Sequence, residues 1–298
     1  MSMAPTDVAD APLFSFGVVA DIQYADKENG SYESQVQRYR EAPGKFEEAV
    51  HYFNSRKDEL LFLLTLGDII DGNVTPEKTE EDFKVVLGVL DKLQIPAHHL
   101  LGNHCLSLPR ERLLKDLKMP ARYSQHKLPH KWRLVILDTM DVSVRWPEGS
   151  PNRQAAAEFM EKHPLGPENP HASIWNGGVG AEQLAWLTEA LQSAERLGEK
   201  VIVCAHHPLV AGSAAPTHLV WNHEEVAEVL ERSPAVAAYF CGHYHIGGYA
   251  QPKRVHYCTF EAILEAPTDE VAHAVVRVFP DKLVIEGQGT VTSRTLQF

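Results

Sequence analysis

Short runs of apolar residues recur along the chain, and most are followed by a segment whose apolar residues fall three or four positions apart. The short runs predict buried β-strands, and the segments between them predict amphipathic helices. Strands are expected at residues 13–20, 60–66, 97–101, 134–137, 201–205, 236–241, 255–260, 272–279 and 282–287. Helices are expected at residues 44–56, 77–93, 181–197 and 223–231.

Strands that alternate with helices indicate an α/β fold with a partly parallel sheet. The last strands follow one another without helices, so this part of the fold is expected to be antiparallel. No stretch reads as a linker, and we expect one domain over residues 1–298 with a flexible tail at residues 1–11. The segment 147–180 contains Pro and Gly, but Trp146 and Trp175 stand near its ends, which favours an ordered insertion.

The composition is that of a globular protein, because 44% of the 298 residues are hydrophobic and 23% are charged. A net charge of −12 without any cluster of Lys and Arg argues against a nucleic-acid surface. The longest apolar run, residues 60–66, is too short to span a membrane, and the N-terminus lacks the pattern of a secretory signal. The four cysteines show no CxxC spacing, as expected for buried thiols in a reducing compartment. We therefore expect a cytoplasmic monomer with no nucleic-acid or membrane partner.

Side chains that can bind metal ions follow five of the predicted strands. They are Asp21 and Gln23, Asp68 and Asp71, Asn103 and His104, His206 and His207, and His243 and His245. The carboxyl ends of strands are where sites form in open α/β sheets. Each group has a plain alternative when it is taken alone, such as a Gly-Asp turn, a left-handed Gly-Asn turn or exposed histidines.

Taken together, these residues offer carboxylates, amide oxygens and imidazoles in a number too large for one ion. A pair of divalent ions that share one carboxylate fits the donor count. Two-metal sites of this kind promote displacement at phosphorus, and the ions would supply the positive charge that this acidic chain lacks.

The blocks "DIQ", "GDIID", "GNHC", "AHHP" and "CGHYH" occur in the order found in the calcineurin-like metallophosphoesterase superfamily, over residues 21–245. The chain resembles this superfamily, which implies a sandwich of two mixed β-sheets flanked by helices. The stretches "DIQYAD", "WNGGVG", "WNHEEV" and "EAILEAP" narrow the resemblance to the manganese-dependent ADP-ribose/CDP-alcohol diphosphatases. That family carries Gln in the first block where the superfamily has His, so Gln23 is a mark of the subfamily. An amide oxygen also suits Mn²⁺ or Mg²⁺, whereas imidazole suits Zn²⁺ or iron.

The resemblance implies a role for each residue of these blocks. One ion would be held by Asp21, Gln23, Asp68 and His245, and the other by the bridging Asp68 with Asn103, His206 and His243. His104 would be the general acid, oriented by Asp71. His207 would be a structural residue or would contact the metal ligands without binding an ion itself. Two positions depart from related enzymes. Gly72 stands where the Ser/Thr phosphatases have an Arg that clamps phosphate, and Cys105 replaces an acid, either as a packed thiol or as a redox sensor.

The implied activity is hydrolysis of the diphosphate bond of ADP-ribose and CDP-alcohols by attack of a metal-bridging hydroxide. The products would be AMP or CMP and the phosphorylated partner, which for the CDP-alcohols is phosphocholine, glycerol phosphate or phosphoethanolamine. Two Mn²⁺ ions would be the cofactors, with Mg²⁺ as the alternative. A cyclic-nucleotide or general phosphodiesterase on the same scaffold is the competing enzyme, and a non-catalytic scaffold protein is the competing class. Candidates for holding the base and ribose are Trp175, Asn176, Trp221 and Asn222, although core tryptophans are the plainer interpretation.

Overall fold

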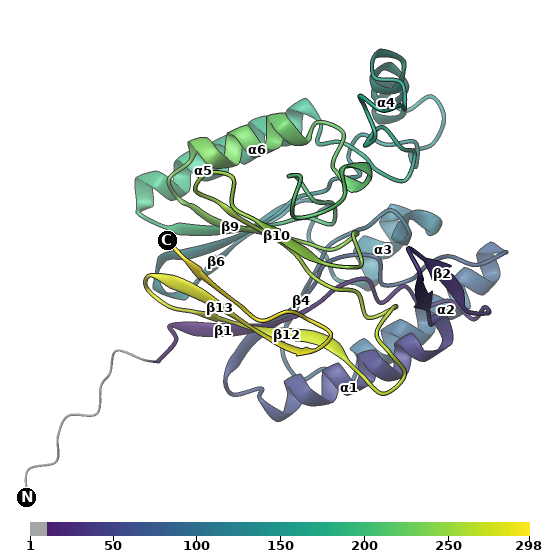
Figure 1. Cartoon of the computed structure of the whole chain (residues 1–298), viewed down its shortest axis with the longest axis horizontal. Helices are drawn as coiled ribbons and strands as arrows, with labels where there is room; N and C mark the ends of the chain where they lie inside the picture. Colours follow the sequence, from purple (N-terminus) through teal and green to yellow (C-terminus); the bar gives the residue numbers. More distant parts are fainter. Residues whose placement is uncertain (1–10) are drawn as a thin grey trace, which may run out of the picture.

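Two six-stranded β-sheets stack face to face in the computed structural model, which describes residues 11–298 (Figure 1). The expected tail at residues 1–11 therefore lies outside the described residues, apart from Ala11. The chain thus has the α/β sandwich of two mixed sheets that the resemblance implied. No helix in residues 11–298 is long and apolar enough to cross a membrane.

The first sheet contains the N-terminal strands and, beside them, the C-terminal ones. Its order is β14 (Arg294–Gln297), β13 (Lys282–Gly289), β12 (Ala272–Val278), β1 (Phe14–Val19), β4 (Leu60–Thr65) and β5 (Ala97–His99). Strands β1, β4 and β5 run parallel, whereas β12, β13 and β14 pair antiparallel with their neighbours. The expected antiparallel pairing is confirmed for β12 and β13, but it is wrong for the strand expected at residues 255–260, which lies in the second sheet and is parallel to the strand expected before it, at residues 236–241.

The second sheet has a parallel centre with an antiparallel strand at each edge. Its order is β10 (Gly248–Ala250), β11 (His256–Thr259), β9 (Val236–Cys241), β8 (Lys200–Cys204), β7 (Trp132–Ile136) and β6 (Ser124–Leu128). Strands β7, β8, β9 and β11 are parallel to one another, and β6 and β10 pair antiparallel. The purely apolar segments predicted as strands form the buried centre of this sheet, as both of its faces are covered.

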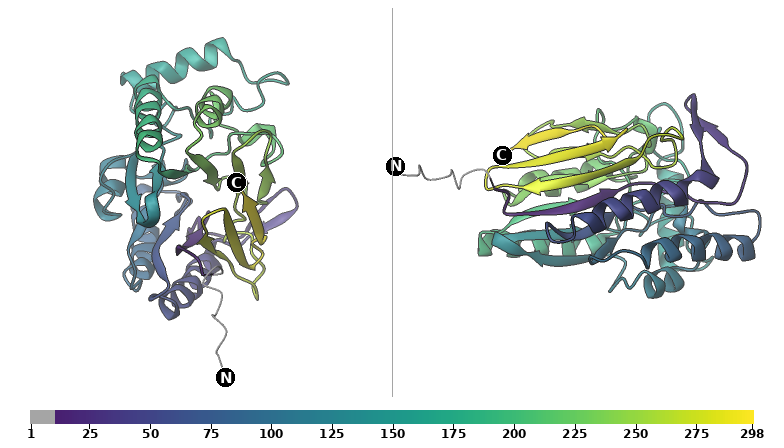
Figure 2. Two further views of the ribbon diagram at one scale, coloured as in Figure 1. Left: turned by 90° about the vertical axis from the view of Figure 1, so that its left-hand side faces the viewer. Right: turned by 90° about the horizontal axis from the view of Figure 1, so that it is seen from below.

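Helices cover the outer faces of the two sheets (Figures 1 and 2). They are α1 (Ala42–Ser55) and α2 (Pro76–Leu90) on the first sheet, and α5 (Ala181–Leu197) and α6 (His223–Arg232) on the second. Packing against the first sheet is close, because a Cβ added at Gly17 of β1 would meet the Phe53 ring of α1 at 2.8 Å. One hydrophobic core fills the space between the sheets and beneath α1 and α2, and a second lies under α5 and α6.

The sequence pattern missed the shorter elements. These are the hairpin β2 (Gly30–Tyr32) and β3 (Gln35–Gln37), helices α3 (Arg110–Asp116) and α4 (Pro151–Lys162), the edge strands β6, β10 and β14, and 3₁₀ turns at Tyr39–Glu41, Cys105–Ser107, Pro129–Lys131 and Pro216–His218. Such elements are half-exposed and carry little apolar periodicity. Helix α4 lies in the segment 147–180 and stands at the upper right of Figure 1, away from the sandwich.

Candidate metal centre and active site

The structure brings the seven predicted metal ligands together where β1, β4, β5, β8 and β9 end. His206 is central to one half of this group. Its Nε2 lies 3.0 Å from Asp68 Oδ2 and 3.2 Å from Asn103 Oδ1. Its ring centroid lies 5.0 Å from that of His243. These four residues are the ones expected to share the second ion.

The other half of the group is built around Asp21 and His245. His245 Nε2 lies 3.6 Å from Asp21 Oδ1 and 3.1 Å from the amide nitrogen of Gln23. The same amide lies 3.4 Å from Asp68 Oδ2, so Asp68 faces both halves. A half-turn of the amide exchanges its nitrogen and oxygen. Gln23 is therefore placed to offer an oxygen to an ion held by Asp21, Asp68 and His245.

Backbone strain is concentrated at these positions. Asp21, Gln23, Asp68 and His243 all have positive φ, at 46°, 43°, 43° and 66°. This left-handed region is unfavourable for residues with a side chain and typically costs 1–3 kcal/mol each where the surrounding structure enforces it. Four of the seven predicted ligands are held in this way, as is common at functional sites.

Two glycines of the motifs are required because a carboxylate lies against them. A Cβ at Gly102 would collide with the Asp68 carboxylate and lie 2.7 Å from His206 Nε2. A Cβ at Gly242 would collide with Asp21 Oδ2. The Gly of "GNH" and that of "CGHYH" thus make room for the two acids at the centre.

The donor set fits divalent cations. Asp21 and Asp68 are completely buried, and Asp21 Oδ1 has no hydrogen-bond partner in the described part of the chain. Buried carboxylates are costly unless they are paired or bind a metal. Burial alone would lower the pKa of His206, but the facing carboxylates of Asp68 and Asp21 raise it, so the site attracts positive charge. Oxygen-rich donors with some imidazole suit Mn²⁺ or Mg²⁺.

A surrounding layer of hydrogen bonds orients the imidazoles. His206 Nδ1 donates to the Leu66 carbonyl at 2.8 Å, and His243 Nε2 lies 2.8 Å from Asn176 Oδ1, leaving Nδ1 of His243 for an ion. His245 Nδ1 lies 2.7 Å from Glu265 Oε1. Partners of this kind fix the ring and raise the basicity of a histidine ligand.

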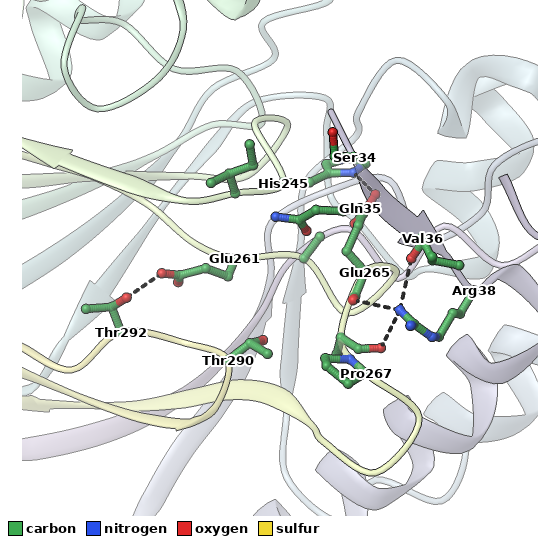
Figure 3. A pocket seen from close by; sticks show the side chains of 13 residues that line it. Ser34, Gln35, Val36, Arg38, His245, Glu261, Glu265, Pro267, Thr290 and Thr292 are labelled. Atoms are coloured by element: carbon green, nitrogen blue, oxygen red, sulfur yellow. Dashed lines mark hydrogen bonds and ion pairs between the residues drawn. The ribbon is translucent and has the colours of Figure 1, made fainter. Parts of the chain in front are cut away.

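Glu265 lies on a loop behind the ligands, beside a cavity of about 570 Å³ (Figure 3). Arg38 donates to the Glu265 carbonyl at 3.1 Å, and the Gln37 amide donates to its carboxylate at 3.2 Å. These hydrogen bonds connect the β2–β3 hairpin to the loop of Glu265, whose carboxylate contacts His245.

His207, the neighbour of His206, has both ring nitrogens engaged away from the centre. Nδ1 lies 2.7 Å from Thr139 Oγ1 and Nε2 lies 3.3 Å from the Trp175 carbonyl. Burial lowers the pKa of His207 well below its usual value, so the ring is neutral. This geometry fits the supporting position expected for it.

His104 faces the cleft with its Nδ1 turned toward Asp71. Nδ1 lies 3.1 Å from Asp71 Oδ1 and 2.9 Å from the Asp71 carbonyl, so Nε2 is left for a substrate. Burial alone would lower the pKa of His104, but the Asp68 and Asp71 carboxylates outweigh it and raise the pKa to about 9. Lys27 forms an ion pair with Asp71 on the other side. The arrangement can present a protonated imidazole to a leaving group.

A cleft of about 540 Å³ opens over these residues. That volume lies within the usual range for small-molecule sites. Trp175, with 43% of its surface exposed, and Tyr32 of β2 both line it. The Tyr32 hydroxyl lies 2.6 Å from His218 Nε2, which joins the β2–β3 hairpin to the loop after β8.

Three of the four candidates for holding base and ribose do not line the cleft. Asn176 is buried and uses its amide on His243 and on the carbonyls of His171 and Thr217. Trp221 is 3% exposed, stacks on Phe159 at 5.0 Å and donates to a backbone carbonyl. Asn222 bonds both backbone groups of Val179. The amides and the indole of these three residues make hydrogen bonds within the protein, so only Trp175 of the four candidates can contact a substrate in the cleft.

Cys105 is completely buried, and its amide donates to Asp68 Oδ1 at 3.2 Å. Burial raises the pKa of its thiol to about 12, which leaves it unreactive at neutral pH. All four cysteines are buried and form no disulfide, as expected from their spacing.

Several residues of the site escaped sequence reasoning. They are Lys27, Tyr32, Arg145, His218 and Glu265. Glu265 lies in a stretch that the sequence singled out, but nothing in that stretch tells which acid faces His245. The others reach the site through tertiary contacts of short loops that leave no periodic signal.

Comparison with known proteins agrees with this geometry. The family model for the calcineurin-like phosphoesterases matches residues 14–247. The chain is 37% identical to a manganese-dependent ADP-ribose/CDP-alcohol diphosphatase of Oryza sativa subsp. japonica, covering 96% of this chain and 95% of that protein. It is 31% identical to the Homo sapiens protein of the same name, with coverage of 96% and 93%. The crystal structure of a dimetal phosphatase from Danio rerio superimposes with a TM-score of 0.88 at 28% identity, covering 96% of this chain and 99% of the other.

The two-sheet sandwich and the donors gathered at its strand ends define a calcineurin-like phosphoesterase. Within this class the full-length likeness is more specific. The chain belongs to the manganese-dependent ADP-ribose/CDP-alcohol diphosphatase family.

Proposed function

We propose that the protein is a manganese-dependent hydrolase of the diphosphate bond of ADP-ribose and CDP-alcohols, including CDP-choline, CDP-glycerol and CDP-ethanolamine. It releases AMP or CMP and the phosphorylated partner. It acts as a monomer in the cytoplasm on a small nucleotide substrate. Mg²⁺ is the second candidate metal.

One observation carries the proposal. Two completely buried carboxylates, Asp21 and Asp68, face His206 and His245 across distances of 3.0 to 4.0 Å, with the amide of Gln23 between Asp68 and His245. Glu265, buried against His245, adds a third carboxylate, so the buried carboxylates outnumber the two imidazoles that they face. Divalent cations would balance the excess negative charge.

The proposed ligands form two sets that share one residue. Asp21, Gln23, Asp68 and His245 would hold one ion, and Asp68, Asn103, His206 and His243 would hold the other. When bound, the two ions supply an activated water and positive charge for displacement at phosphorus. Glu265 and Asn176 keep the ligand histidines in the tautomer and orientation that this requires.

His104 acts on the departing phosphate through Nε2, while Asp71 holds the ring from Nδ1. In the reaction an oxygen–phosphorus bond forms to one phosphate, and the bridging bond breaks with its electron pair on the second phosphate. A phosphate monoester has its second pKa near 6, so the departing group needs little protonation at neutral pH. His104 therefore serves mainly as a charged hydrogen-bond donor.

Trp175 and Tyr32 offer aromatic faces for a nucleotide base in the cleft. Bases stack on such rings with little preference between them. Acceptance of both ADP-linked and CDP-linked substrates is consistent with stacking rather than with readout of base edges.

A panel of substrates tests the proposal. The protein is freed of metal, reloaded with Mn²⁺ or Mg²⁺, and assayed on ADP-ribose, CDP-choline, CDP-glycerol and a cyclic nucleotide. The proposal expects faster turnover of the diphosphates, with Mn²⁺ the better activator. Preferential hydrolysis of the cyclic nucleotide would instead favour a phosphodiesterase, and no metal-dependent turnover of any substrate would favour a non-catalytic scaffold.

A further inference from the structure

Arg145 stands out as a cation without a partner at the rim of the substrate cleft. It is exposed and lines the same cleft as His104 and Trp175. Within residues 11–298 no carboxylate lies within 4.0 Å of its guanidinium group, and that group donates no hydrogen bond. Exposed arginines are often unpaired, so the significance of this one depends on its surroundings.

The loop that carries Arg145 is firmly braced. Arg110 donates to the Arg145 carbonyl at 3.3 Å, and its guanidinium lies 3.8 Å from the centroid of the Trp146 ring. The Trp146 indole donates to the Asp141 carbonyl at 2.8 Å. The backbone on both sides of Arg145 is therefore fixed, while its side chain is free to reach a ligand.

The nearby cations already have partners. Arg122 bonds Asp138 and Asp141, each at 2.8 Å. Lys27 is paired with Asp71. Among the described residues that line the cleft, Arg145 is the one side chain with a permanent positive charge, because the lining holds no lysine and no second arginine.

The proposed reaction increases the negative charge in the cleft. A diphosphate conjugate carries about one charge on each phosphate, and each product monoester carries nearly two above pH 7, because its second pKa lies near 6. Bound metal ions would supply positive charge to the phosphate under attack. The other phosphate gains charge as the bridging bond breaks, in a chain whose own net charge is −12.

We propose that Arg145 binds the departing phosphate of the diphosphate substrate and so makes the enzyme selective for diphosphates over simple phosphodiesters. This inference rests on the proposed diphosphatase function. A guanidinium can form two parallel hydrogen bonds to a phosphate. Such an arginine would bind phosphate in place of the arginine that related Ser/Thr phosphatases carry at the position of Gly72.

The test compares Arg145→Ala and Arg145→Lys with the wild-type protein, each loaded with Mn²⁺. One substrate is ADP-ribose, which has a departing phosphate. The other is bis(4-nitrophenyl) phosphate, whose single phosphate is the one attacked. The matched control is Arg196→Ala, which removes an exposed arginine from the last turn of α5.

For ADP-ribose, Arg145→Ala should lower kcat/KM about 10- to 100-fold, since a hydrogen bond to a charged group is typically worth that much. A larger share should fall on kcat, because the charge grows in the transition state. Lysine should restore part of the loss, and so should millimolar guanidinium added to the alanine variant. For bis(4-nitrophenyl) phosphate the loss should be at least five times smaller.

Equal losses on both substrates, or an unchanged kcat/KM for ADP-ribose, would overturn the role of Arg145. An equal loss of kcat/KM in Arg196→Ala would show that the change in net charge explains the effect, and it would also overturn the role of Arg145. Failure of the wild-type protein to hydrolyse ADP-ribose would instead remove the proposed function and this inference with it. Matching thermal unfolding curves for the three variants show that each has folded.

Discussion

Replacing Glu265 by glutamine should weaken metal binding while leaving the fold intact. Its carboxylate lies 2.7 Å from His245 Nδ1, and only 3% of its side chain is exposed. Burial alone would lower the pKa of His245, but Glu265 and Asp21 raise it well above its usual value. The carboxylate therefore raises the basicity of the His245 imidazole and makes it a stronger ligand for a metal ion. Loss of such a partner typically costs 10- to 100-fold in metal affinity, which is about 1.4–2.7 kcal/mol.

Titration of Mn²⁺ into metal-free protein by calorimetry measures this effect. The matched control is Glu261→Gln, since Glu261 lines the same cavity but bonds Thr292 at 2.6 Å instead of a ligand histidine (Figure 3). We expect Glu265→Gln to weaken at least one Mn²⁺ site, and Glu261→Gln to bind as the wild type does. Equal Mn²⁺ affinities in wild type and Glu265→Gln would refute the view that this carboxylate supports the metal centre.

Three further predictions concern other groups. Gln23→His should keep the fold, lose part of the Mn²⁺-supported turnover and bind Zn²⁺ more tightly, because imidazole is the softer donor; an unchanged metal profile in activity and binding assays would contradict this. His104→Ala should slow ADP-ribose hydrolysis about 10- to 100-fold, the usual loss for one charged hydrogen bond, but a dialkyl phosphodiester by roughly 10³- to 10⁴-fold, because an alkoxide needs the proton; similar losses in kcat on both would argue against a general acid. His273 is buried with neither ring nitrogen bonded, and burial lowers its pKa to about 4, below the unfolded value near 6.5. The free energy of unfolding should therefore fall by up to about 3 kcal/mol as the pH falls from 6.5 toward 4. Urea unfolding of His273→Phe should show a loss smaller by that amount over the same range. An equal loss in the two proteins would contradict the prediction.

The parallel centre of the fold could be predicted from sequence because its strands are buried on both faces. Strand β9 and helix α5 begin and end at the expected residues, and all six residues of β9 are buried. Strand β6, by contrast, alternates between half-buried and exposed side chains at an edge and carries polar residues. Edge strands of this kind are defined by pairing with a neighbour, which a local pattern does not record.

The candidate ligands could be predicted for a related reason. Each follows a strong strand signal directly, so the chain itself delivers it to the edge of the sheet. Glu265, Tyr32 and Arg145 reach the same place by way of irregular loops and a short hairpin. Trp221 was a misleading candidate because a tryptophan beside a polar residue looks the same in sequence whether its ring faces a cleft or, as here, Phe159.

In the proposed centre, two divalent ions share the carboxylate of Asp68. Crystals of the protein grown with Mn²⁺ and measured at the manganese absorption edge would show whether they do. We predict two anomalous peaks about 3.5–4 Å apart, one beside Asp21, Gln23 and His245, the other beside Asn103, His206 and His243, with Asp68 between them. A single peak, or a pair of peaks of which one is out of reach of Asp68, would show that Asp68 does not bridge two ions.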